Sequence, residues 1–206
     1  MPINLKKKYD LIFARERQVA NSVALQVIKS KPFSVWEVLI PIIFILGFMR
    51  SKEQREIFAQ NLMFTKKMAL QAAFEMLKKG QSKEAAMSRI AAETQGLLSS
   101  IPNGVYSDAI RQKQLEEIEL LIEHYCRLMR AEGTDYVTLV ADAYKTREDY
   151  AVFQAKLILA ESAVTRAARE TLGNQADHQT AARIETATEK FRQQEAETIY
   201  RPQSPH

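Results

Sequence analysis

The chain has 206 residues and a net charge of +4, with 46% hydrophobic and 26% charged residues. These values exclude wholesale disorder and suit one ordinary domain with an appended segment. A single cysteine, Cys126, excludes an internal disulfide and favours a reducing compartment. Few glycines and prolines stand against abundant Ala, Leu, Glu, Lys, Arg and Gln, so we expect an all-α helical bundle.

The charge is distributed unevenly along the chain. Residues 1–90 hold 16 Lys and Arg against 7 Asp and Glu, whereas residues 91–206 hold 13 against 18. The positive half suits an anionic lipid surface, and membrane lipids are therefore the predicted partner. The basic residues are scattered and do not gather with stacking aromatics, so the pattern does not favour nucleic acid.

Five regions are expected along the chain. They are a basic N-terminal helix (1–32), a hydrophobic membrane segment (33–50), a basic helical region (51–100), a helical bundle region (107–173) and a polar helical tail (174–206). The turn signal at 101–104, Ile-Pro-Asn-Gly, lies near the point where the charge changes sign. No internal repeat is present.

The first expected helix covers residues 10–30. Asp10 can cap its start, and Pro32 ends it because the residue before a proline is pushed out of helical geometry. The three lysines at positions 6–8 are expected to be solvated or to lie at a phosphate surface.

The most apolar stretch is residues 33–49, and no residue from Val38 to Met49 carries a charged or polar side chain. Nine strongly apolar side chains in it give a membrane-insertion free energy of about −3 to −5 kcal/mol. The expected membrane-contacting residues are Trp36, Val38, Leu39, Ile40, Ile42, Ile43, Phe44, Ile45, Leu46 and Phe48. The expected headgroup-contacting residues are Lys29, Lys31, Arg50 and Lys52.

Three interpretations of residues 33–49 compete. A run of this length is often a central core helix. As a single span it covers roughly 25 Å, slightly less than the hydrocarbon core of about 30 Å. The third interpretation is a shallow insertion kinked at Pro41, with both ends on one side. The two flanks carry similar numbers of Lys and Arg, so we favour the shallow insertion slightly over the span.

The remaining helices are placed by caps and glycines. They are expected at 52–79 (ended by Gly80), 82–98, 107–132 (ended by Gly133), a short helix after 134, 146–172 and 179–200. In the helix expected at 107–132, the predicted buried positions are Ile110, Ile118, Leu121, Ile122, Tyr125 and Met129. In the helix expected at 146–172, they are Tyr150, Phe153, Leu157, Ala160, Val164 and Ala167. The last helix is polar, and we expect it to pack weakly or protrude.

Candidate chemistry is sparse. His124 and Cys126 are two positions apart and point to different sides of a helix, and Cys126 is interpreted as a core residue. The acidic residues Glu116, Glu117, Glu119 and Glu123 lack the Glu-x-x-His spacing of a bundle metal site. Glu123 and Arg127 are instead expected to form a surface pair. No phosphate loop or nucleophile elbow is present, so no catalytic, cofactor or metal residue is assigned.

These features predict a non-enzymatic, membrane-associated helical protein that acts as an anchor, scaffold or accessory subunit through protein contacts. The bulk of the chain is expected on the cytoplasmic side. The alternative is a soluble helical adaptor whose residues 33–49 are buried in its own core or in a homo-oligomer interface.

Overall fold

The computed structural model describes residues 4–27, 51–100, 106–173 and 178–200, and these residues are helical throughout apart from short connections. This confirms the all-α prediction. The helices are α1 (Leu5–Val27), α2 (Ser51–Leu62), α3 (Phe64–Lys79), α4 (Lys83–Ser100), α5 (Asp108–Arg130), α6 (Tyr136–Tyr144), α7 (Arg147–Leu172) and α8 (His178–Ile199).

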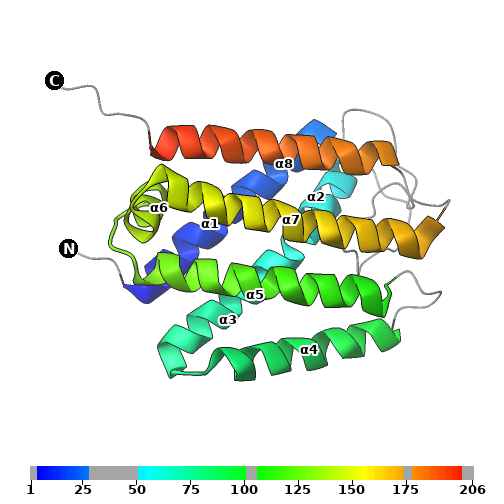
Figure 1. The fold of residues 1–206 in the computed structure, drawn as a ribbon, viewed down its shortest axis with the longest axis horizontal. Coiled ribbons are helices and arrows are strands. Elements are labelled where there is room, and N and C mark those ends of the chain that lie inside the picture. The colour runs from blue at the N-terminus through cyan, green and yellow to red at the C-terminus, as the bar shows by residue number, and fades with distance from the viewer. Residues whose placement is uncertain (1–3, 28–50, 101–105, 174–177, 201–206) are drawn as a thin grey trace.

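The helices form two layers (Figure 1). In the front layer α4, α5, α7 and α8 lie side by side and roughly parallel or antiparallel. Behind them α1 and the successive helices α2 and α3 cross at an oblique angle, and short α6 covers one end. This layering lets each helix bury its apolar stripe against a neighbour.

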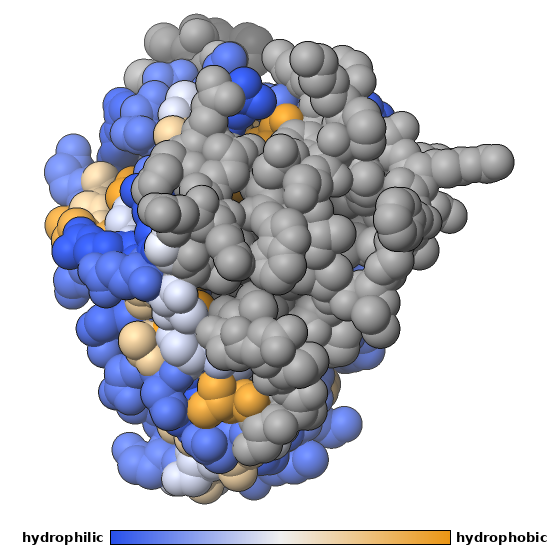
Figure 2. Space-filling view, turned by 90° about the vertical axis from the view of Figure 1, so that its right-hand side faces the viewer, coloured by the Kyte–Doolittle hydropathy of each residue, from blue (hydrophilic) through white to orange (hydrophobic). Residues whose placement is uncertain are grey.

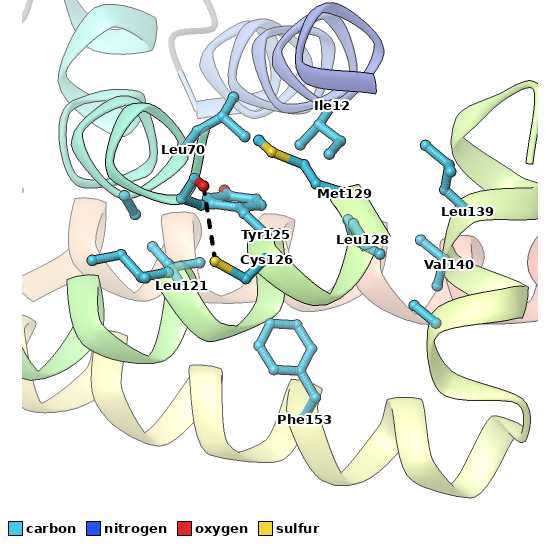
Figure 3. Packing of buried hydrophobic residues seen from close by; sticks show 14 of the residues in the cluster. Ile12, Leu70, Leu121, Tyr125, Cys126, Leu128, Met129, Leu139, Val140 and Phe153 are labelled. Atoms are coloured by element: carbon cyan, nitrogen blue, oxygen red, sulfur yellow. Dashed lines mark hydrogen bonds between the residues drawn. The ribbon is translucent and has the colours of Figure 1, made fainter. Parts of the chain in front are cut away.

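Helix α5 lies at the centre of the main core. Its residues Leu121, Tyr125 and Cys126 lie toward Leu70 of α3, whereas Phe153 of α7 packs on its opposite side (Figure 3). The same apolar cluster includes residues from α1, α3 and α4. Residues before and after the predicted turn at 101–104 therefore share one core. All six positions predicted to be buried in α5 are buried. Cys126 is also buried, with its Sγ 4.0 Å from the carbonyl oxygen of Ala73.

A second apolar cluster joins α1, α2 and α8. Val23 and Val27 of α1 share it with Phe58 of α2 and Ile184 of α8. In α7, Tyr150, Phe153, Leu157, Val164 and Ala167 are buried as expected, while Ala160 is half-buried.

The helix caps follow the sequence signals closely. The hydroxyls of Ser82, Ser107 and Thr146 accept hydrogen bonds from the backbone amides three residues later, and thereby satisfy free donors at the starts of α4, α5 and α7. Asp135 forms a reciprocal capping box with Thr138 at the start of α6. Gly80 ends α3 with a φ of 67°, in the left-handed region that favours glycine.

The N-terminal helix starts earlier than predicted. Asn4, rather than Asp10, accepts the hydrogen bond from the Lys7 amide, so the lysine triplet lies within α1. Lys8 is buried, and its ammonium donates to the carbonyl oxygens of Met129 and Ala131 at 3.1 and 2.7 Å. The prediction of a solvated Lys8 is therefore wrong, because the negative end of the α5 dipole and its unpaired carbonyls attract the ammonium.

The helix predicted over 52–79 is two helices, because the α-helical pattern breaks at Met63 between α2 and α3. The predicted surface pair of Glu123 with Arg127 is also wrong. Glu123 instead pairs with Lys83 of α4 at 2.8 Å, and the Arg127 guanidinium donates to the carbonyl oxygen of Ala143.

Helix α8 is polar as predicted, but it neither protrudes nor packs weakly. It lies against α1, α6 and α7, and Ile184, Ala187 and Ala196 are buried. Polar contacts add to this packing: Glu195 pairs with Arg15 of α1 at 3.0 Å and accepts a hydrogen bond from Tyr150 at 2.7 Å. A hydrophobicity pattern cannot register such contacts, which explains the error.

Gly133 is required by a close approach of chain segments rather than as a helix stop, since α5 already ends at Arg130. A Cβ at this position would lie 2.6 Å from the Thr138 hydroxyl oxygen and 2.9 Å from the Leu139 amide nitrogen. We expect Gly133→Ala to lower the free energy of unfolding by roughly 1–3 kcal/mol because α6 must shift. Urea unfolding measures the effect.

Gly96→Ala provides the matched control. Gly96 lies exposed in α4, and a Cβ there would meet no atom within 4 Å. The same chemical change should therefore stabilise the protein by about 0.5–1 kcal/mol through helix propensity. Equal effects of the two substitutions would contradict the steric role of Gly133.

The surface shown in Figure 2 is mainly hydrophilic where it is coloured, and its apolar side chains form small separate patches. Of the large apolar side chains in the described residues, only Leu25, Val137, Val152 and Leu159 are exposed. Singly exposed apolar residues of this kind are ordinary in globular proteins.

Candidate functional site

The residues predicted to contact the membrane all lie outside the described part of the chain. The same holds for Lys29, Lys31 and Arg50 among the predicted headgroup contacts, while Lys52 falls in the first turn of α2. Within the described ranges, no helix combines the length and apolar character needed to cross a membrane.

The described residues instead reveal a group of charged side chains inside the bundle. Glu16 of α1 is 9% exposed and pairs with Lys66 of α3 at 2.6 Å. The Tyr125 hydroxyl donates to the other Glu16 oxygen at 3.0 Å. Burial is the largest single effect and disfavours both charges, but the attraction between the two groups and their hydrogen bonds together outweigh it. The pKa of Glu16 therefore lies below its ordinary value and the pKa of Lys66 above, so both remain ionised.

A second ion pair links α7 and α8 next to the first. The Arg192 guanidinium contacts the Glu161 carboxylate at 2.5 Å, and both side chains are largely shielded from solvent. This pair holds the polar helix α8 against the bundle from inside.

Glu117 of α5 is a third buried carboxyl group, and it lacks such a partner. Its Oε1 accepts a hydrogen bond from Thr65 at 2.9 Å, and among the described residues no lysine or arginine forms a salt bridge with it. Burial raises the pKa of Glu117 to about 7, and repulsion from the Glu161 carboxylate adds to this effect. Glu117 therefore exchanges a proton near neutral pH.

His124 lies on the same side of α5 as Glu117, but its side chain packs within the main core. Its ring stacks on Phe153 with the centroids 4.1 Å apart, and its Nδ1 lies 2.7 Å from the Tyr144 hydroxyl oxygen. Burial lowers the pKa of His124 to about 3, so its imidazole is neutral at physiological pH. Across the described ranges, no three His, Cys, Asp or Glu residues gather as metal ligands would.

Several of these charged side chains line a cavity of about 220 Å³. The charged lining residues are Lys66, Glu117, Glu161, Glu185, Glu189 and Arg192, and Ala, Val, Leu, Ile, Asn, Ser and Thr side chains complete the lining. A water needs only about 10–15 Å³ of such space, so the cavity can hold a small molecule. We take this cavity as the candidate site.

Sequence reasoning missed the residues of the cavity, although one signal was present. Positions 110, 114, 117, 121, 124 and 128 of α5 alternate steps of four and three, and all six are buried. These six positions form one inward-facing stripe of α5, here called its seam. The seam contains Gln114, Glu117 and His124 beside Ile110, Leu121 and Leu128. Polar residues at regular seam positions indicate a buried network.

Fold and site together define an all-α two-layer bundle with ion pairs and a polar cavity in its interior. Searches of protein-family models, curated proteins and solved structures found no match to this chain.

Proposed function

We propose that the protein is a non-enzymatic, membrane-associated helical protein that acts as an anchor, scaffold or accessory subunit. Residues 33–49 would insert into lipid, with Trp36 and the flanking Lys and Arg at headgroup depth and the bundle on the cytoplasmic side. The support from the sequence is the uninterrupted apolar run between cationic flanks.

The apolar run carries the proposal of membrane insertion, and the observation that bears on its topology is the antiparallel packing of the helices on either side of residues 28–50. Tyr9 contacts Phe74, Glu16 pairs with Lys66 and Val27 shares an apolar cluster with Phe58, so the two chain segments run in opposite directions. Figure 1 shows α1 and the α2–α3 segment side by side in the rear layer.

This packing constrains how residues 28–50 can meet a membrane. Both of their ends are attached to one folded body, which supports a topology with both ends on the same side of the membrane. Two crossings would need roughly 40 residues, well more than this segment has. The fold therefore favours the shallow, one-leaflet insertion over the single span, which would pull α1 and α2 apart.

Membrane attachment is tested by carbonate washing. We expect the full chain to remain in the membrane pellet, and a variant lacking residues 33–49 to be released, because about 3–5 kcal/mol of insertion free energy is lost. Replacing residues 33–49 by a Gly/Ser linker of equal length separates lost hydrophobicity from lost length. Release of the full chain would instead support the adaptor alternative, with residues 33–49 buried within the protein.

Topology is tested by cysteine labelling in a Cys126→Ala background. Asn21 of α1 and Gln60 of α2 are exposed and flank the segment, so each is changed to cysteine in turn. In sealed vesicles, a membrane-impermeant maleimide should reach both positions from the same side. Labelling of the two positions from opposite sides would establish a single span and contradict the shallow insertion.

A further inference from the structure

The cavity described above is lined by four glutamates, one lysine and one arginine. Glu117 lines its inner end and is 4% exposed, while Glu185 and Glu189 of α8 line it from an exposed position. The lining thus combines exposed carboxylates on α8 with a buried carboxyl group on α5.

The cations that line the cavity are already engaged. Lys66 pairs with Glu16, and Arg192 pairs with Glu161. Glu117 accepts a hydrogen bond from Thr65 but forms no salt bridge within the described part of the chain. A buried carboxylate without a cation is energetically costly, so a ligand that brings a positive charge gains the most from this position.

The rest of the lining indicates the shape of that ligand. Aliphatic side chains from four helices, including Val23, Leu62 and Ile184, form an apolar wall. Thr188 and Asn61 add hydrogen-bonding groups. A volume of about 220 Å³ lies below the roughly 300–1,000 Å³ of pockets for drug-sized ligands, so it suits a small molecule best.

We propose that this cavity binds a small aliphatic ammonium compound, with its charged head on the Glu117 carboxylate and its alkyl chain along the apolar wall. The exposed Glu185 and Glu189 attract the cation to the opening. Such a site goes beyond membrane attachment, because it lets the protein sense or carry a small amine.

Three probes of nearly equal size and different charge test the proposal by calorimetry on the full chain. They are n-butylammonium, 1-butanol and butyrate. We expect n-butylammonium to bind with a dissociation constant of about 1 mM, given its few heavy atoms. The neutral and anionic probes should bind at least about tenfold more weakly, because they cannot pair with the carboxylate.

The variant Glu117→Gln keeps the shape of the side chain and removes its charge, so it should weaken n-butylammonium binding by at least about tenfold. Glu116→Gln is the matched control, because Glu116 lies on the same helix but pairs with Lys113 at the surface. Absence of saturable n-butylammonium binding, equal binding of butanol or butyrate, or undiminished binding by Glu117→Gln would each overturn the proposal. These outcomes do not depend on residues 33–49, so they are distinguishable from a failure of the membrane proposal.

Discussion

Replacing Lys66 with methionine is expected to lower the free energy of unfolding by about 3–5 kcal/mol, because it leaves the buried Glu16 carboxylate without its cation. Lys66 and Glu16 lie 2.6 Å apart in the interior, and the Tyr125 hydroxyl compensates only one carboxylate oxygen. Urea unfolding followed by circular dichroism measures the loss, provided that the m-value is unchanged.

Two variants show whether the loss comes from an unpaired charge. The double variant Glu16→Gln with Lys66→Met removes both charges and should recover most of the lost stability. Lys83→Met is the surface counterpart, because Lys83 pairs with Glu119 and Glu123 in partly exposed positions. It should cost less than about 1 kcal/mol. Equal losses at Lys66 and Lys83 would contradict a buried ion pair.

Glu117 should make the stability of the protein fall as the pH rises from 4.5 to about 7. The pKa of Glu117 is raised from 4.5 to about 7 by burial, so the folded state holds this proton more tightly than the unfolded state. The resulting stabilisation is complete below pH 4.5 and is lost between pH 4.5 and 7. A pKa shift of this size contributes about 3 kcal/mol to the free energy of unfolding at low pH.

The measurement compares the wild type with Glu117→Gln near pH 5 and near pH 8. The glutamine accepts the Thr65 hydrogen bond but does not titrate. The stability of the variant relative to the wild type should therefore rise by roughly 2–3 kcal/mol between these pH values. Glu116→Gln, at an exposed position on α5, should show no such change. Parallel pH profiles of wild type and Glu117→Gln would show that the Glu117 carboxyl is solvated.

Much of the helical framework could be predicted because caps and apolar stripes are local signals. Ser107 and Thr146 each satisfy backbone amides within the next turn, and such hydrogen bonds depend only on nearby sequence. The break at Met63 has no glycine or proline to mark it, so the sequence suggested one continuous helix where the protein has two.

The charged interior could not be predicted, because its partners come from distant parts of the chain. Lys66 on its own resembles a surface lysine, and only the fold brings Glu16 within 2.6 Å of it. Glu161 and Arg192 likewise lie on different helices, and Glu117 was considered only as part of a possible metal cluster. Buried ionic contacts add no apolar residue to the pattern, and the regularly spaced polar positions of α5 mark a polar interior without naming its ion pairs.

The contact of Arg15 with Glu195 joins residues 180 positions apart and has a consequence for synthesis of the chain. Until the ribosome has produced α8, Arg15 of α1 lacks its ionic partner Glu195. The second apolar cluster, which joins α1, α2 and α8, lacks Ile184 over the same period. Residues 33–49 leave the exit tunnel well before that stage. The apolar residues 33–49 are thus available to a bilayer or a chaperone before α8 packs against the rest of the bundle.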